Sequence, residues 1–381
     1  MIKKASTIII SLSLSLIFLE LILNTFIGKP WVGGQQYSSL YGWENRPNTS
    51  GRYFLEGKSY VKINSTGFND NEHSVPKEKG TFRIAVLGDS YVEAIQVDRS
   101  DKFWNRLEKI ANQKFRGNNI QKYEVMAFGV SGWGPLQQFL LLESEVLKYN
   151  PDLIIVLITT GNDIIDSSKV FDSVKNRPYF VKKDGSYQID TSFKNVQNSL
   201  WRKDLGVIDN SSIYKWTRLC LSVVRNNIKS AVINLRQDDT LINHSYYAPV
   251  EYNNDWQAAW DATFEAYSRM IKLSEYTDKK ILFVLGTNYD QLQNYNLMKD
   301  GILQRSHSHY TPNRYLIEFF QIRNVQYIDL IEHLNTEQWS DQFRFIHGSY
   351  PKWQGHWNIF GHKVAADIIS QYFSSTNFII R

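Results

Sequence analysis

Four short segments of the sequence carry residues that suit the cleavage of an ester. A serine follows Gly88-Asp89, and a histidine stands at position 356. A histidine can take the proton of a serine hydroxyl while that hydroxyl attacks an acyl carbon. A glycine N–H at position 132 and the carboxamide at position 162 can stabilise the oxyanion that forms. The candidates are therefore Ser90 as nucleophile, Gly132 and Asn162 as oxyanion donors, and His356 as base.

Three of these segments follow apolar runs typical of buried strands. The run Asp152–Ile158 is apolar almost throughout, as expected of a parallel strand that helices cover on both faces. The run before Ser90 is broken by Gly88, and Tyr91–Ala94 can begin a helix. We therefore expect Ser90 on a sharp strand-to-helix turn at the C-terminal edge of a sheet. His356 comes 266 positions later (356 − 90), so only the fold can join the two.

Together the four segments resemble the blocks of the SGNH hydrolases, also called GDSL-type esterases, which carry Ser, Gly, Asn and His in this order. The resemblance covers about Thr81 to Phe373 and implies an α/β fold, a three-layer, doubly wound parallel sheet of flavodoxin-like type. It also implies roles for four residues. Ser90 is the nucleophile, its own N–H, the Gly132 N–H and the Asn162 side chain form the oxyanion hole, and His356 is the general base.

The sequence departs from this family three residues before the histidine. Family members usually carry an aspartate there, which fixes the imidazole tautomer and stabilises the imidazolium. Here the position is Trp353, followed by Gln354. Three interpretations stay open: a Ser-His dyad oriented by a backbone carbonyl, a carboxylate such as Asp341 or Asp329 from elsewhere, or a site without catalysis. We expect the dyad, and therefore a slow enzyme, because a neutral acceptor fixes the tautomer but stabilises the imidazolium less.

Several other reactive side chains are interpreted as structural. His362, behind Gly361 at the start of a predicted helix, matches a second histidine of the family pattern. Asp89 and Asp163 have the positions of residues that cap backbone N–H groups. Cys220, the only cysteine, lies between two leucines and is predicted to be an inert buried thiol. No His/Cys cluster has the spacing of metal ligands, so we expect neither a metal nor a cofactor.

An apolar stretch from Ile8 to Ile27 is long enough to cross a membrane as a helix. Lys3 and Lys4 precede it, so the positive-inside rule places everything after Lys29 on the outer side. A cleaved signal peptide is the alternative. We prefer an uncleaved anchor over residues 1–29, because the apolar region is long and no small-x-small cleavage site follows it.

Glu20, inside this stretch, is costly in lipid and suggests a contact with another membrane helix. A membrane protein partner could supply that helix. Snorkelling of the Glu20 side chain toward the interface is the alternative. The formal charge of +5 is mild for 381 residues and no basic run is present, which argues against nucleic acid as a partner. The 11 Trp and 22 Tyr exceed what a core needs and suit a sugar surface, while peripheral packing explains them equally well.

The rest of the chain divides by composition and periodicity. Residues 30–80 are predicted to form a partly ordered stalk that packs on a hydrolase-like domain at 81–375. An insertion at about 166–254, with a helical pattern around Trp216–Leu235, is expected to cover one side of the active site and to set specificity. Beyond it, helices at Asp255–Tyr276 and Pro312–Arg323 alternate with strands at Lys280–Gly286 and Val325–Asp329, which supports a doubly wound parallel sheet.

These features predict a membrane-anchored, extracytoplasmic serine esterase or O-acyl (acetyl) transferase. Its expected substrate is an acyl ester, most plausibly acetate, on a surface or secreted polysaccharide. The substrate class rests on location, aromatic content and family analogy. Two alternatives are a lipid or phospholipid esterase and a catalytically weak binding or scaffold partner of a membrane acyltransferase.

Overall fold

A central parallel sheet organises the chain in the structure, a computed structural model that describes residues 2–115, 120–172, 175–196, 211–236, 254–287, 291, 311–334, 355–376 and 378–379. Within these residues the sheet has five strands in the order β11-β10-β7-β5-β6. Numbered along the chain, this order is 5-4-3-1-2, the flavodoxin-like order of a doubly wound sheet, and it confirms the predicted fold class. The strands are β5 (Thr81–Gly88), β6 (Lys122–Gly129), β7 (Leu153–Thr159), β10 (Lys280–Gly286) and β11 (Tyr327–Asp329).

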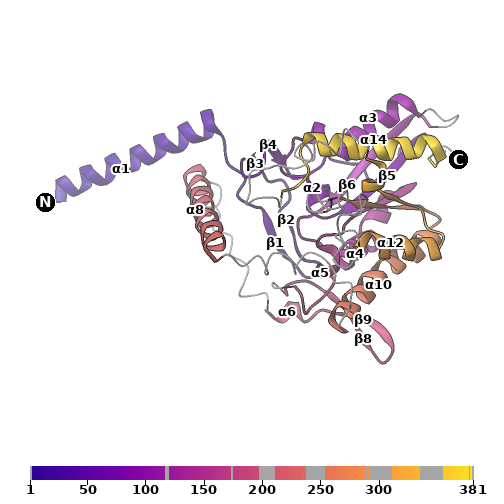
Figure 1. Cartoon of the computed structure of the whole chain (residues 1–381). Helices are drawn as coiled ribbons and strands as arrows, with labels where there is room; N and C mark the ends of the chain where they lie inside the picture. Colours follow the sequence, from indigo (N-terminus) through magenta and orange to yellow (C-terminus); the bar gives the residue numbers. More distant parts are fainter. Residues whose placement is uncertain are drawn as a thin grey trace.

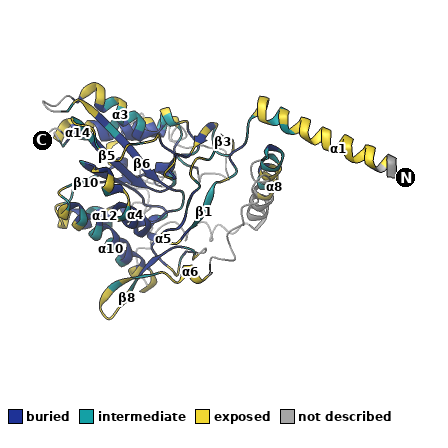
Figure 2. Cartoon of the chain, turned by 180° about the vertical axis from the view of Figure 1, so that it is seen from behind, coloured by how far each residue is buried: buried dark blue, intermediate teal, exposed yellow. Residues whose placement is uncertain are grey.

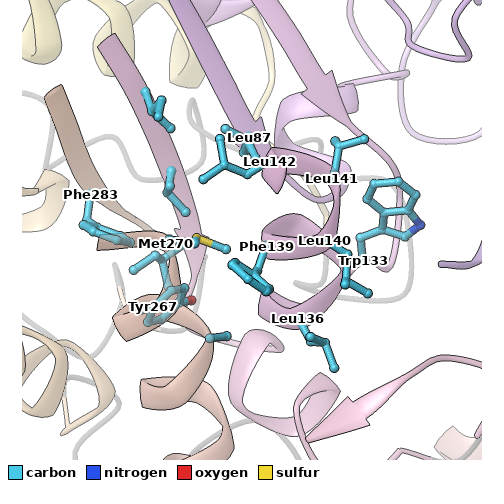
Figure 3. Close-up of a cluster of buried hydrophobic side chains, with 14 of the residues drawn as sticks. Leu87, Trp133, Leu136, Phe139, Leu140, Leu141, Leu142, Tyr267, Met270 and Phe283 are labelled. Carbon is cyan, nitrogen blue, oxygen red and sulfur yellow. The ribbon is translucent and has the colours of Figure 1, made fainter. Parts of the chain in front are cut away.

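Helices cover both faces of the sheet and make the three layers (Figure 1). Successive side chains of a strand point to opposite faces, so Ala85 and Leu87 enter one core and Ile84 and Val86 the other. Figure 3 shows the first core, with Leu87 of β5 and the buried residues Phe139 and Met270 among its side chains. The helices of the first face are α4 (Pro135–Ser144), α10 (Asn254–Tyr276) and α12 (Thr311–Ile322), and those of the second are α3 (Phe103–Lys114) and α14 (Ile359–Thr376).

The carboxyl ends of the three strands that precede the candidate residues meet at one edge. Gly88 of β5 is level with Gly129 of β6, and Leu87 is level with Val156 of β7. The chain order reverses around β5, which pairs with both neighbours. In open α/β sheets the crevice at such a switch point is where ligands bind. The fold therefore brings the first three candidate segments to a suitable place.

The elements expected beyond the insertion are confirmed. The predicted helices and strands correspond to α10, β10, α12 and β11, with β11 two residues shorter at its start than expected. Within the predicted insertion, a tight turn at Asp184 and Gly185 joins two antiparallel strands. The remaining short elements are α2 (Ser90–Glu93), α5 (Asp163–Asp166), α6 (Phe193–Val196), β8 (Tyr179–Lys183), β9 (Ser186–Asp190) and the 3-10 turns Arg99–Asp101, Val146–Tyr149 and Leu330–His333.

Residues 30–80 form short strands and contribute buried side chains to two cores. Trp31, Val61 and Ile63 form a small core together with Tyr53, and Trp43 joins the larger core of the sheet domain. The segment therefore packs on the domain through buried aromatic residues along its length. Its strands form two antiparallel pairs, β1 (Gln35–Ser38) with β2 (Gly42–Asn45) and β3 (Ser50–Tyr53) with β4 (Ser59–Lys62).

Two helices stand apart from the sheet (Figure 1). The first, α1 (Ile2–Ile22), continues through a π-helical turn at Leu23–Ile27 and ends at Gly28, whose φ of +83° few other residues adopt. It is exposed along most of its described length (Figure 2), and the stretch Ser6–Ile27 is long and apolar enough to cross a membrane. The second, α8 (Ser212–Arg236), is the helix predicted within the insertion, and its start contacts α1.

The prediction of a buried thiol at Cys220 is wrong. Cys220 lies on α8 and is exposed, as is the adjacent Leu221, although Leu219 is buried. The flanking leucines do not predict burial here because α8 is amphipathic and no described part of the sheet domain covers its Cys220 side.

Candidate active site

Ser90 lies where β5 turns sharply into the short helix α2. The Asp89 side chain accepts a hydrogen bond from the Tyr91 N–H and so caps this helix, as the structural interpretation of Asp89 predicts. A Cβ on Gly88 would come within 2.4 Å of the Val92 side chain, so glycine is needed for the helix to fold back this closely. The turn presents the Ser90 hydroxyl at the carboxyl edge of the sheet, as expected.

His356 bridges the Ser90 hydroxyl and a carboxylate. Its Nε2 lies 2.8 Å from the Ser90 Oγ, and its Nδ1 lies 2.6 Å from Oε2 of Glu56. A hydrogen on Nδ1 donated to Glu56 leaves Nε2 free to accept the serine proton. Glu56, His356 and Ser90 thus form a continuous hydrogen-bonded series of carboxylate, imidazole and hydroxyl.

The structure therefore differs from the expected dyad, in which a backbone carbonyl orients the imidazole. A carboxylate takes that position, and it is neither of the two named from the sequence. Asp329 accepts a hydrogen bond from Asn313 and caps Ile331 at the end of β11. Asp341 lies outside the described residues, as do Trp353 and Gln354.

Sequence reasoning missed Glu56 because nothing local marks it. It lies 300 positions before His356, between β3 and β4, in the segment that resembles no family block. The carboxylate reaches the imidazole only because residues 30–80 pack against the sheet domain. A signal that could have raised the question was the missing acid itself, since it required an acid from some other segment.

Aromatic rings hold the imidazole in place. The ring of Tyr91 packs against His356 with the centroids 5.1 Å apart, and Tyr91 also meets Trp357 edge-on. The Trp357 indole is buried and donates to the Thr287 carbonyl oxygen over 2.8 Å. The imidazole is thus held by packing against Tyr91, which Trp357 backs, as well as by its two polar partners.

The surroundings of His356 raise its pKa above the ordinary value. Burial opposes the charged form, but the hydrogen bond and charge of Glu56 outweigh it, helped by Asp89 and Glu93. An imidazole with a raised pKa is a stronger base, and its protonated form is stabilised when it takes the serine proton.

The loop that carries Gly132 is held from both sides. Glu93 accepts hydrogen bonds from the N–H and the hydroxyl of Ser131, and the Trp43 indole donates to the Ser131 carbonyl oxygen over 3.1 Å. The Gly132 carbonyl oxygen accepts from Arg177 over 2.7 Å. Gly132 itself has a φ of +79°, and its N–H makes no hydrogen bond within the described part of the chain. The structure therefore fixes this turn while leaving one donor available.

Asn162 follows β7, and its side-chain amide is engaged by two carboxylates. Nδ2 donates to Asp89 over 3.2 Å and to Asp166 over 2.9 Å. Burial raises the pKa of both carboxyl groups, and Asp166 also pairs with Arg177. The amide is thus oriented, and the expected role in an oxyanion hole requires one of these hydrogen bonds to be exchanged.

The other two interpretations of polar residues as structural agree with the contacts. Asp163 is fully buried, accepts from the Thr159 N–H over 2.9 Å, and has a pKa raised well above its ordinary value by burial and by Asp89. His362 is also fully buried, and its Nδ1 accepts from the Phe103 N–H over 3.3 Å. Both residues join elements together behind the site.

No protein-family model matches this sequence, and a search of curated proteins found no match. Among solved structures, the chain is similar to a putative acylhydrolase from Bacteroides fragilis, with 12% identity, a TM-score of 0.34 and coverage of 77% of this chain and 87% of that one. An acetyl xylan esterase gives 12% identity, a TM-score of 0.39 and coverage of 77% and 99%. A two-domain esterase active on acetylated mannans gives 12% identity and a TM-score of 0.39, with coverage of 78% of this chain and 50% of that one. Likenesses this distant add nothing to the geometry described above.

Proposed function

We propose that this chain is a serine esterase, or an acyltransferase that uses the same residues. The observation that carries the proposal is the hydrogen-bonded series Glu56, His356, Ser90, with 2.6 Å and 2.8 Å between successive partners. A half-buried carboxylate, an imidazole and a serine on a strand-to-helix turn form the arrangement that activates a serine for acyl transfer.

In the proposed reaction the Ser90 oxygen attacks the acyl carbon while His356 takes the hydroxyl proton. Glu56 stabilises the imidazolium, and the oxyanion takes hydrogen bonds from the Ser90 and Gly132 N–H groups and from an Asn162 N–H released by one of its carboxylates. The ester bond then breaks, and the imidazolium returns its proton to the leaving alcohol. Water or a second alcohol attacks the acyl-serine by the same steps in reverse and regenerates the serine.

We further propose that the domain works outside the membrane, with α1 as a retained anchor. Glu20 of α1 and Asn24 of the π-helical turn bind the first residues of α8, and the Gly28 carbonyl oxygen accepts from the Trp216 indole over 3.2 Å. Cleavage after α1 would remove most of these partners, which supports an anchor over a signal peptide. Lys3 and Lys4 then face the cytoplasm.

The proposed substrate is an acyl ester on a polysaccharide at the cell surface, with acetate as the favoured acyl group. The proposed location and the many aromatic residues support it. A lipid esterase remains the second candidate, because the Trp216 ring of α8 lies 5.6 Å from Phe54, two residues before the acid, and so links the site to the membrane-proximal helices. The scaffold alternative was suggested by the missing aspartate, and Glu56 removes that reason.

The test is covalent labelling of the full chain in detergent with a fluorophosphonate, followed by peptide mass analysis. We expect a label on Ser90 that disappears in Ser90→Ala and falls strongly in His356→Ala. Ser186→Ala, in the exposed β8–β9 turn, is the matched control and should label like the parent. Folded protein that takes no label would overturn the proposal.

Substrate class is tested next with p-nitrophenyl esters of increasing chain length and with acetylated xylan. A preference for acetate and release of acetate from the polymer support the first candidate. Activity that rises with chain length favours the lipid esterase.

A further inference from the structure

Helix α8 has the composition of a helix that binds a membrane surface. Its 25 residues include five basic side chains and no acidic one. At 100° per residue, Cys220, Leu221 and Val224 share one side, and Arg218 and Arg225 lie away from it. Basic amphipathic helices of this kind lie in the lipid interface, with the apolar side toward the acyl chains and the basic side toward the headgroups.

The apolar side of α8 is exposed in the structure. Leu221 is 63% exposed and Val224 is 54% exposed, and Cys220 on the same side of the helix is exposed as well. Exposed aliphatic side chains gathered on one face of a helix mark an interaction surface. Figure 2 shows that α8 stands away from the sheet domain, on the same side as α1.

A polar contact joins the beginning of α8 to α1. The Glu20 carboxylate accepts hydrogen bonds from the Ser212 N–H over 2.6 Å and from the Ile213 N–H over 3.0 Å. The Ser211 hydroxyl donates to the same carboxylate over 2.9 Å. The first N–H groups of a helix have no partner within the helix and carry partial positive charge. The contact therefore gives hydrogen-bond partners to the first N–H groups of α8. It also gives donors to the Glu20 carboxylate, which is costly inside an apolar span.

The depth of this contact fits a membrane interface. The stretch Ser6–Ile27 has 22 residues, so it is about 33 Å long and matches a hydrocarbon core of about 30 Å. Glu20 lies about 10 Å before Ile27 at 1.5 Å per residue. Interfacial helices sit about 5–10 Å into the boundary between headgroups and acyl chains. The start of α8 thus lies near the outer boundary of the membrane that α1 would span.

We propose that α8 is an interfacial helix that lies in the outer leaflet of this same membrane, held there by Glu20 and inserted through the side that bears Cys220, Leu221 and Val224. The proposal rests on the anchor proposed for α1. It gives Glu20, expected from the sequence to contact another membrane helix, a partner within the chain itself.

The single cysteine of the chain allows a direct test on the whole protein in liposomes. An environment-sensitive fluorophore on Cys220 should be quenched by nitroxide-labelled lipids and protected from aqueous iodide. The matched control is Arg218→Cys in a Cys220→Ser background, where iodide should quench and lipid nitroxides should not. Adding Leu221→Glu and Val224→Glu to the parent should move the Cys220 label into water.

Two outcomes overturn the proposal. A Cys220 label as open to iodide as the Arg218→Cys label means that α8 stays in water. A label shielded from both quenchers means that α8 packs on a second copy or on another protein. Alkaline carbonate extraction of the same liposomes separates this failure from that of the anchor. Loss of the protein from the membrane contradicts the assignment of α1, on which the proposal rests, whereas retained protein with a Cys220 label open to iodide contradicts only the placement of α8. The fluorophosphonate test of the active site is independent of both.

Discussion

The parallel sheet and the N-terminal segment 30–80 both supply the site, yet they differ in how they do it. The sheet places Ser90 and Asn162 directly after strands, where regular backbone geometry fixes their position. The N-terminal segment places Glu56 in an irregular link between two short strands. The link is stabilised by packing, with Trp31 and Ile63 buried behind it. The proposed acid can thus be carried by a segment without a recognisable pattern, provided that its neighbours bury enough surface to hold it.

The two regions are also joined by polar contacts. Asn45 of β2 donates to the Glu93 carboxylate over 2.9 Å, and the same carboxylate fixes the turn before Gly132. His73 connects Asp70 of the segment to Glu124 of β6, with 3.0 Å to each. Changes in the segment should therefore affect both catalysis and stability, and the following experiments separate the two effects.

The largest effect is expected for Glu56→Gln, which keeps the shape but removes the charge opposite His356. The loss in kcat should be about 10³–10⁴-fold, because an amide neither stabilises the imidazolium nor enforces the tautomer. The activity requires neutral His356, whose pKa Glu56 helps to raise, so the acidic limb of the pH profile should move to lower pH in the variant. Steady-state kinetics between pH 5 and 9 measure both.

Glu78→Gln, an exposed change in the same segment, is the control for Glu56→Gln and should leave kcat unchanged. Retention of full activity by Glu56→Gln would return the site to a dyad and make the N-terminal segment purely structural.

A smaller loss is expected on the sheet side for Asn162→Ala. Removing one oxyanion donor costs about 10²–10³-fold in kcat, with KM nearly constant, because the contact forms only as charge develops. The variant also leaves Asp89 and Asp166 without the amide. A lower melting temperature with unchanged kcat would show that Asn162 only separates the two carboxylates.

The next effect concerns stability across the junction. Although burial opposes its charge, the hydrogen bonds that the His73 imidazolium donates to Asp70 and Glu124 raise the pKa of His73 to about 9. This contribution is fully present below the unfolded pKa near 6.5 and is lost as pH rises through about 9. It amounts to about 3 kcal/mol at 1.36 kcal/mol per pKa unit. Urea unfolding in detergent at pH 6 and pH 10 should show the decrease, and His73→Gln should abolish most of it.

The smallest effect is expected for Trp43→Phe. The ring that lies 4.9 Å from the Arg177 guanidinium is partly kept, while the hydrogen bond from the indole to Ser131 is lost. One such bond contributes about 1 kcal/mol, so thermal unfolding should shift by a few degrees and kcat should fall a few-fold. A much larger fall in kcat would assign the Gly132 turn more control over the reaction than the Asn162 amide.

The sequence allowed the sheet half of the site to be predicted because its evidence is local. Apolar runs such as Asp152–Ile158 mark strands, and Gly88 marks the turn before the nucleophile. The acid could not be found, because the contact of Glu56 with His356 depends on tertiary packing across 300 positions. Exposure of Cys220 was missed for a related reason, since two flanking leucines say nothing about which side of a helix meets the rest of the chain.

The end of α1 has one more consequence. Directly after Gly28, the Lys29 carbonyl oxygen accepts from the Arg52 N–H over 2.8 Å, and the Trp31 N–H donates to the Arg52 carbonyl oxygen over 2.6 Å. Arg52 belongs to β3, which leads into the loop of Glu56. These contacts tie the end of α1 directly to β3, with no flexible linker between them in the described residues. If α1 spans a membrane as proposed, the proposed esterase acts at a fixed height above the lipid and reaches only ester groups within that narrow zone.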